Sequence, residues 1–380
     1  MTAPATSPAP VPAQQPAPGR TTAEPVRRAA GERPLRIALV ADPYIPVPPL
    51  HYGGIERILH FLVSGLVERG HEVVLWAAPG SEVPCEVVEY GSPPHFGTAD
   101  RARELLQVST SLLRRRREFD VVHSFGRLAN LLPLFAFRIP KVQSYQRAIS
   151  PRGIRWASRL AGDTITFTAC STNCRRPVSH LGRWETVYNG VRLSDFAFRP
   201  AVEDDAPLVF LGRIERIKGA HTAIAVAKAT GRRLVLAGNV VEDAPHKRYF
   251  EEEIVPHLDG ERIEYVGPVN DVQKNELLGR ASAFLMPIEW EEPFGIVMAE
   301  ALACGTPVVG FRRGSVPEVV EHGASGFVCD TPEEMAEAVA RVGTLDRADA
   351  RARAERHFSD RVIVDAYEDL YRRVLSPVRR

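Results

Sequence analysis

The chain has 380 residues, 44% of them hydrophobic and 25% charged, and its formal net charge is +1. This length allows two domains of ordinary size, and the balanced charge gives no overall attraction to nucleic acid or to a membrane. Composition therefore disfavours a protein that binds by electrostatics alone, and it leaves enzymes and small-ligand binders open.

Residues 1–34 are rich in Ala and Pro and lack an apolar run of signal-peptide length, so we expect a disordered tail there. No later stretch reaches about 18 consecutive apolar residues, which argues against a transmembrane helix. The five cysteines are odd in number and scattered along the chain. This usage suits a reducing, cytoplasmic location better than a disulfide framework.

Regular elements begin after the tail. Residues 36–42 form a nearly continuous apolar run, as a strand buried on both faces requires. Apolar residues then recur three and four apart between Ile55 and Leu66, which predicts a helix, and Gly70 follows it as a C-cap glycine would. Residues 71–77 and 119–123 are the next predicted strands. Between about 126 and 200 the pattern predicts mixed helices and strands without giving their order.

The same alternation restarts in the second half. Its predicted strands are residues 207–212, 233–238, 262–267, 283–287 and 307–311, with helical segments between them. Two successive β-α-β series predict an α/β protein of two Rossmann-like domains, residues 35–200 and 201–358, facing each other across a cleft. A ligand is then expected at the carboxyl ends of the strands, in that cleft.

Two clusters that follow strands are suited to bind phosphate. Gly53 and Gly54 open a helix, where backbone can approach an anion closely, although a plain turn is the alternative. Arg213 and Lys218 lie after the first strand of the second half, and together they can neutralise a diphosphate. The chain lacks Gly-x-Gly-x-x-Gly after a strand and Gly-x4-Gly-Lys-Ser/Thr, which disfavours dehydrogenases and P-loop NTPases.

Two carboxylates stand at the ends of an apolar run. Glu292 lies in a loop at the mouth of a predicted helix, and Glu300 lies within that helix. Apolar neighbours argue against full exposure of Glu300, and a buried acid needs hydrogen-bond donors, which ribose hydroxyls supply. Two acids beside a basic diphosphate site therefore predict a site for a nucleotide sugar.

Other polar positions have competing interpretations. His123 ends a predicted strand and is expected to face the cleft, although a lone histidine after a strand is more often structural. Ser315 and Glu318 fit a capping box, which makes Glu318 structural. The four consecutive arginines at 114–117 are more typical of a solvated helix face than of a membrane patch. Contact with an anionic lipid surface is expected to be at most peripheral.

Five motifs recur together in this chain. They are Gly212-Arg213 with Lys218-Gly219, the acids Glu292 and Glu300 with seven residues between them, Ala303-Cys-Gly-Thr-Pro-Val-Val309, Val187-Tyr-Asn-Gly-Val191, and Gly53-Gly54. Their combination resembles the large family of GT-B-fold, retaining nucleotide-sugar glycosyltransferases, and the similarity extends from about residue 35 to 375. The resemblance also implies that a last helix, at about 359–375, crosses back onto the first domain.

The resemblance implies roles for the matching residues. Arg213 and Lys218 would bind the donor diphosphate, Glu292 the transferred hexose, and Glu300 the ribose. His123 would approach the donor sugar, so the catalytic residues would be His123, Arg213, Lys218 and Glu292. The full donor-binding set would be Gly53, Gly54, Arg213, Lys218, Val269, Glu292, Phe294, Gly295, Ile296 and Glu300, with the loop around Val269 against the base and the backbone at 294–295 on the sugar or phosphates.

The implied reaction moves a hexose from a UDP-glucose-like or GDP-mannose-like donor to a hydroxyl of a small-molecule, glycan or lipid-linked acceptor. The acceptor attacks the face that the diphosphate leaves, and a phosphate oxygen takes its proton, so catalysis rests on positioning and charge stabilisation. Two cations would replace a metal ion, and neither a metal, a cofactor nor a nucleic acid partner is expected. A sugar-nucleotide epimerase and a catalytically silent sugar-nucleotide-binding protein are the alternatives.

Overall fold

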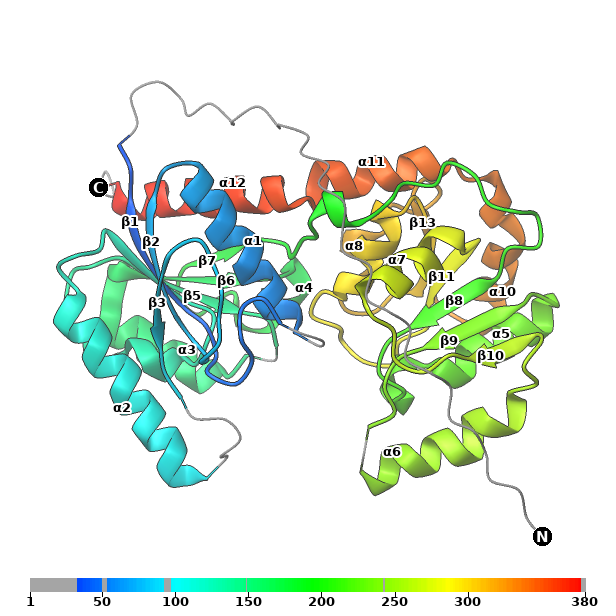
Figure 1. Cartoon of the computed structure of the whole chain (residues 1–380), viewed down its shortest axis with the longest axis horizontal. Helices are drawn as coiled ribbons and strands as arrows, with labels where there is room; N and C mark the ends of the chain where they lie inside the picture. The colour runs from blue at the N-terminus through cyan, green and yellow to red at the C-terminus, as the bar shows by residue number, and fades with distance from the viewer. Residues whose placement is uncertain (1–32, 50–52, 92–96, 148, 242, 377–380) are drawn as a thin grey trace, which may run out of the picture.

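The computed structural model describes residues 33–49, 53–91, 97–147, 149–241 and 243–376. They form two α/β domains side by side along the long axis of the molecule, each built on one parallel sheet (Figure 1). The predicted class, two Rossmann-like domains, is confirmed. Apart from its last two residues, the tail predicted to be disordered lies outside the described residues.

The N-terminal sheet has seven parallel strands in the order β3-β2-β1-β4-β5-β6-β7. Their bounds are Arg36–Val40 (β1), Glu72–Ala77 (β2), Glu86–Glu89 (β3), Val121–Ser124 (β4), Lys141–Tyr145 (β5), Ile165–Ala169 (β6) and Trp184–Thr186 (β7). The strand order reverses between β1 and β4, which pair directly. The carboxyl ends of these two strands therefore form the crevice in which a ligand is expected to bind.

Helices cover both faces of this sheet. On one face, α1 (Gly54–Glu68) and α12 (Asp360–Leu375) enclose one half of the domain core. On the other, α2 (Thr98–Arg115), the 3-10 segment η1 (Leu128–Leu134) and α3 (Pro151–Ala161) enclose the second half. Figure 1 shows the two layers on opposite sides of the strands. A short helix, α4 (Thr172–Arg175), follows β6.

The C-terminal sheet has six parallel strands in the order β10-β9-β8-β11-β12-β13. Their bounds are Leu208–Leu211 (β8), Leu234–Ala237 (β9), Ile263–Tyr265 (β10), Ala283–Met286 (β11), Val308–Phe311 (β12) and Gly326–Cys329 (β13). Its helices are α5 (Ala220–Thr230), α6 (Ala244–Tyr249), α7 (Asp271–Arg280), α8 (Ile296–Ala303), α9 (Val316–Val319), α10 (Pro332–Arg341) and α11 (Arg347–His357). Here the order reverses between β8 and β11, so the loops after these two strands form the second crevice.

The predicted strands in both halves coincide with observed ones. In the first half they correspond to β1, β2 and β4, and in the second to β8 through β12. The predicted helix is α1, and Gly70 ends it with a positive φ of 77°. The pattern did not resolve β3, β5, β6, β7 or β13.

After α11 the chain returns to the first domain. The backbone N–H of Val191 donates to the carbonyl of Phe358, and that of Asp360 donates to Val191, which fixes the crossing point. Beyond it α12 packs along α1. A Cβ on Gly65 of α1 would lie 2.8 Å from Cγ2 of Val364, so glycine lets the two helices approach closely.

An ion cluster secures α12 to the end of α1. The carboxylate of Glu368 accepts hydrogen bonds from Nη1 of Arg69 at 2.8 Å and from Nη2 of Arg372 at 2.7 Å. Partial burial opposes ionisation of Glu368, but these guanidinium groups outweigh it and lower the pKa of the carboxyl to about 2.

We expect Glu368→Gln to lower the free energy of unfolding at pH 7 by about 1–2 kcal/mol, because Arg69 loses a charged partner. A lowered pKa stabilises the fold above the unfolded-state pKa, and this contribution is lost as the pH falls from about 4.3 towards 2. Chemical denaturation from pH 7 to pH 3 should show that the difference in unfolding free energy between the wild type and Glu368→Gln becomes smaller at acid pH. Glu355→Gln, which breaks an exposed pair with Arg351, is the control and should cost less.

Candidate active site

The two crevices face each other, and several pairs of residues meet between the domains. Gly54, at the start of α1, lies against Ile296, at the start of α8, because a Cβ on Gly54 would be 2.9 Å from Cδ1 of Ile296. Nη1 of Arg57 is 2.7 Å from a carboxylate oxygen of Asp271. The thiol of Cys170 reaches the carbonyl of Pro293 at 3.5 Å. Two residues predicted for donor binding, Gly54 and Ile296, are thus brought together.

The glycine pair packs over a buried acid. A Cβ on Gly53 would lie 2.7 Å from Cβ of Pro49 and 2.9 Å from Oε2 of Glu56, so no larger side chain fits. Glu56 is 6% exposed. Burial, and then the nearby charge of Asp42, raises the pKa of the Glu56 carboxyl. The glycine pair is therefore packed in place rather than being a plain exposed turn.

The loop after β8 presents its basic side chains in different directions. Nη1 of Arg213 pairs with the buried acid Glu215 at 2.9 Å while its own side chain stays 45% exposed. Lys218 ends the 3-10 segment η5 (Arg216–Lys218). The next residue, Gly219, has a φ of 80°, and a Cβ there would lie 2.0 Å from the carbonyl oxygen of Pro287 after β11. This close approach seats Lys218 beside the loop that carries Glu292.

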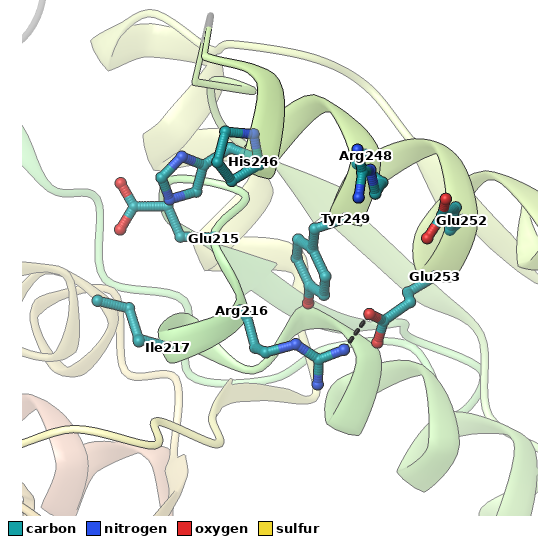
Figure 2. A pocket seen from close by; sticks show the side chains of 9 residues that line it. Glu215, Arg216, Ile217, His246, Arg248, Tyr249, Glu252 and Glu253 are labelled. Atoms are coloured by element: carbon teal, nitrogen blue, oxygen red, sulfur yellow. Dashed lines mark hydrogen bonds and ion pairs between the residues drawn. The ribbon is translucent and has the colours of Figure 1, made fainter.

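A pocket of about 310 Å³ lies between the same loop and the residues of α6 and the turn that follows it (Figure 2). Arg216 lines it, pairing with Glu253 and lying 5.4 Å from the ring centroid of Tyr249. None of the predicted donor-binding residues lines this pocket. Because Arg216 is held there, Arg213 and Lys218 are the cations of this loop that remain for the cleft.

Glu292 is held by two donors from the second domain. Nζ of Lys218 and Nε1 of Trp290 both reach its Oε2, the latter at 3.0 Å, and the Lys218 ammonium lies 4.8 Å from the Trp290 ring centroid. The Glu292 backbone is also fixed, since a Cβ on Gly314 would lie 2.4 Å from its N and O atoms. The structure thus brings together Lys218 and Glu292, two predicted site residues.

Glu300 also has a lysine partner, which the sequence pattern did not reveal. Nζ of Lys274, on α7, donates to Oε1 of Glu300 and lies 3.2 Å from a carboxylate oxygen of Asp271. Burial alone would lower the pKa of Lys274, but the charge of Glu300 outweighs it and the pKa is raised. Asp271 in turn pairs with Arg57, so a chain of charges connects Glu300 to the other domain.

The start of α8 supplies backbone groups to the same region. Gly295 has a φ of 71° and is the N-cap residue, with no side chain capping the helix. The Phe294 side chain is buried against Tyr188 and Phe358, so only its backbone can serve a ligand. Val269 lies partly exposed in the loop before α7, at the same end of the sheet.

His123 lies away from these residues. Its side chain is fully buried, with Nδ1 2.7 Å from the Tyr371 hydroxyl and Nε2 2.6 Å from the Ser144 hydroxyl. Burial lowers the pKa of the imidazole to about 3, so the ring is neutral. The expectation that His123 faces the cleft is therefore wrong, because its side chain projects from β4 into the layer between the sheet and α12. A direct contact with a donor sugar has no support in this arrangement.

We expect His123→Ala to lower the free energy of unfolding by about 2 kcal/mol, since it removes a packed ring and leaves two buried hydroxyls without this partner. Because the folded-state pKa is depressed, the wild type should lose stability as the pH falls from about 6.5 towards 3. The variant should lack this part of the pH dependence. Denaturation curves at several pH values test this, and unchanged stability with lost turnover would contradict the structural role.

The capping box expected at Ser315 and Glu318 is also wrong. Oγ of Ser315 donates to the carbonyl of Phe294, which braces the Glu292 loop instead of capping α9. The Glu318 carboxylate accepts the backbone N–H groups of Thr172 and Asn173, each at 2.7 Å. Glu318 is structural as predicted, but it caps α4 of the other domain, where an acid at a helix N-terminus is favourable.

The sequence pattern also did not reveal an ion pair at the crevice of the first domain. Asp42 follows β1 and Arg147 follows β5, and Oδ2 of Asp42 lies 2.7 Å from Nη2 of Arg147. Arg147 is 67% exposed, so its guanidinium can also contact a ligand. The signal available was position, since both residues stand two positions beyond the end of a strand.

Among the residues that the structure describes, no group of three or more His, Cys, Asp or Glu side chains is arranged to hold a metal ion. Within the same residues, no helix combines the length and the apolar character needed to cross a membrane.

Comparisons with known proteins match both halves of the chain. The model described as Glycosyltransferase Family 4 matches residues 52–195, and the one described as Glycosyl transferases group 1 matches residues 192–357. A glycogen synthase of Mycobacterium tuberculosis is 27% identical over 381 residues, covering 85% of this chain and 89% of its own.

Solved structures share the two-domain arrangement. AviGT4, a glycosyltransferase involved in avilamycin A biosynthesis, is 28% identical with a TM-score of 0.65, covering 90% of this chain and 98% of its own. The Anabaena protein Alr3699/HepE, solved in complex with UDP-glucose, is 18% identical with a TM-score of 0.68, covering 89% of this chain and 100% of its own. At 18% identity, the likeness to Alr3699/HepE is one of fold alone. Both of these structures have the GT-B fold.

Proposed function

Since the chain belongs to the group 1 glycosyltransferases, we propose that it moves a hexose from a nucleotide sugar to an acceptor hydroxyl with retention at the anomeric carbon. The observation that carries the proposal is the pair of Lys–Glu contacts, Lys218 with Glu292 and Lys274 with Glu300, on one side of the cleft. Each acid is buried beside a cation, so each can accept a sugar hydroxyl while the cation attracts phosphate.

The donor is proposed to lie along the carboxyl ends of β8 and β11 and against the first turn of α8. Glu300 would hold the ribose and Glu292 the hexose, with the diphosphate between them on Arg213, Lys218 and the uncapped N–H groups of α8. A helix N-terminus with free N–H groups favours an anion, which supports this placement. Val269 would border the base. A UDP-linked hexose is the first donor to test, because a neighbour of the same fold holds UDP-glucose.

The proposed chemistry rests on charge stabilisation. As the bond to the anomeric carbon breaks, negative charge gathers on the leaving diphosphate, and Arg213 and Lys218 are fixed to receive it. Arg213 is oriented by Glu215, and Lys218 by Glu292, so both cations are preorganised before the donor arrives. The acceptor would attack from the side that the diphosphate leaves, and a phosphate oxygen would take its proton. His123, being buried, has no place in this proposal.

A panel of UDP-, GDP- and ADP-linked hexoses, assayed for thermal stabilisation and for slow donor hydrolysis, tests the proposal. Release of a hexose with its anomeric configuration kept would support a retaining transferase. Conversion of one nucleotide sugar into its epimer would favour the epimerase instead, and stabilisation without any turnover would favour a silent binding protein.

Turnover is proposed to be independent of divalent metal, because Arg213 and Lys218 supply the positive charge at the diphosphate. Extensive chelation should therefore leave the rate of donor turnover unchanged, as measured by release of nucleoside diphosphate. Loss of activity on chelation, with recovery on adding magnesium or manganese, would contradict this assignment.

The five cysteines are free, and we propose a reducing, cytoplasmic setting.

A further inference from the structure

Helix α3 exposes two large apolar side chains. Trp156 is 63% exposed and Leu160 is 56% exposed, and they lie one turn apart on the same side of the helix. The opposite side of α3 carries Ile154, Ala157 and Ala161, which are buried in the core under the sheet. The exposed pair is therefore not needed to hold α3 in place, and an exposed tryptophan beside a leucine is a feature that binding surfaces share.

The same exposed side of α3 is basic. Arg152, Arg155 and Arg159 are all exposed, and the helix contains no Asp or Glu. Within the described ranges none of these three guanidinium groups takes part in an ion pair. Three arginines without an ion-pair partner among the described residues thus flank Trp156 and Leu160 along one short helix.

The surrounding surface continues both properties. Helix α3 lies in one layer with η1 and α2, on the side of the first sheet away from α1 and α12 (Figure 1). This layer also exposes Leu132 of η1 at 48% and Leu106 of α2 at 65%. Residues 101–183 hold sixteen Arg and Lys but only four Asp and Glu, whereas the whole chain has a net charge of +1. This stretch, which includes α3, η1 and most of α2, therefore carries an excess of positive charge.

We propose that this face, centred on α3, docks onto a membrane surface that contains anionic lipid. Arginines attract anionic headgroups, while tryptophan and leucine enter the boundary between headgroups and acyl chains, where tryptophan is favoured. A nucleic acid would also attract the arginines, but it offers no apolar layer for Trp156 and Leu160. The four arginines at 114–117 are not the centre, since Arg115 bridges Glu86 and Glu118 and Arg116 packs on Phe137.

Docking through α3 would also orient the cleft. Helix α3 begins shortly after Arg147, the exposed residue that pairs with Asp42 at the crevice of the first domain. Because the proposed donor site lies on the second domain, the acceptor would lie on the first, and a membrane against α3 would border that side of the cleft. This arrangement favours a lipid-linked acceptor. Only this last step rests on the proposed function, because docking is measured without any donor or turnover.

Flotation of the full chain with lipid vesicles tests the docking. The wild type should float with vesicles of phosphatidylcholine mixed with phosphatidylglycerol, and it should not float with vesicles of phosphatidylcholine alone. High salt should release it from the anionic vesicles. The variant Arg152→Gln/Arg155→Gln/Arg159→Gln should weaken vesicle binding on the order of a hundredfold. Trp156→Ala/Leu160→Ala should weaken it about tenfold. Both variants should melt as the wild type does, because the replaced side chains are exposed.

The matched control removes three exposed arginines from the second domain, Arg233, Arg262 and Arg356, and should float as the wild type does. The proposal is overturned if the wild type does not bind anionic vesicles, or if the α3 variants bind as well as the control. It is also overturned if the wild type ignores vesicles but retards a single-stranded RNA in a gel, since the basic face would then serve a nucleic acid.

Discussion

Replacing Lys218 by alanine is expected to lower kcat/KM for the nucleotide-sugar donor by about 10²- to 10³-fold. The Lys218 side chain is mostly buried, so its charge acts in a medium that screens it less than water does. The charge on the leaving diphosphate grows as the bond breaks, so a fixed cation stabilises the transition state more than the bound donor. Both a lower kcat and a higher KM should therefore appear in steady-state kinetics with varied donor.

The control for Lys218 lies two residues away. Arg216→Ala removes a cation from the same 3-10 segment, but Arg216 points to Glu253 and Tyr249, so donor kinetics should change little. Equal losses in the two variants would mean that general charge, rather than the position of Lys218, matters.

A double variant separates two causes of the loss. Lys218→Ala also leaves the buried Glu292 without its ammonium partner, which by itself can disturb the loop. Adding Glu292→Gln relieves that unpaired charge. If activity then returns to the level of Glu292→Gln alone, Lys218 serves only to neutralise Glu292 and its role at the diphosphate is wrong.

Much of the fold could be predicted because the inner strands of both parallel sheets are buried on both faces. The runs at β1, β8, β9, β11 and β12 are short and almost entirely apolar, which is what a doubly covered strand requires. Two of the strands that escaped notice break this pattern. β3 is a half-exposed edge with acids at both ends, and β5 contains Lys141 and Gln143, whose side-chain nitrogens donate to backbone carbonyls.

The partners of the site residues were much harder to predict. Sequence patterns placed Glu292, Glu300 and Lys218 after strands or in a helix, but they could not pair side chains from distant segments. Lys274 stands 26 residues before its partner Glu300, on a helix without a recognisable motif. His123 was misplaced for a related reason. Its strand continues to Ser124, so the alternation of side chains, rather than the end of the strand, decides which way the imidazole points.

The lysine partners also change the reason why two buried acids are tolerated. From the sequence, sugar hydroxyls were the donors that a buried Glu300 would need. In the structure Lys274 meets that need without a ligand, as Lys218 and Trp290 do for Glu292. Both carboxylates are thereby oriented before the donor binds, and each has a further lone pair to offer a hydroxyl.

The two carboxylates are expected to have separable roles. Glu300 is assigned to the ribose, remote from the bond that breaks. Glu300→Gln should therefore mainly raise the donor KM, and it should also weaken the binding of free nucleoside diphosphate. Lys274 keeps Asp271 as a partner in this variant, so its charge does not become isolated. The lost charged hydrogen bond should cost about 1.5–3 kcal/mol, or roughly ten- to a hundredfold.

Glu292→Gln should behave differently, because Glu292 is assigned to the hexose, whose ring gains positive charge as the bond breaks. Turnover should fall roughly ten- to a hundredfold while nucleoside diphosphate binds as in the wild type. Glu291→Gln, an exposed neighbour in the same loop, is the matched control and should leave donor kinetics unchanged, since an amide oxygen can still accept from Gly314 and Asn173. Isothermal titration with the nucleoside diphosphate, beside steady-state kinetics, decides the matter. The assignment fails if Glu292→Gln lowers the affinity for nucleoside diphosphate as much as Glu300→Gln does, because an acid that binds the hexose makes no contact with a nucleotide that lacks it.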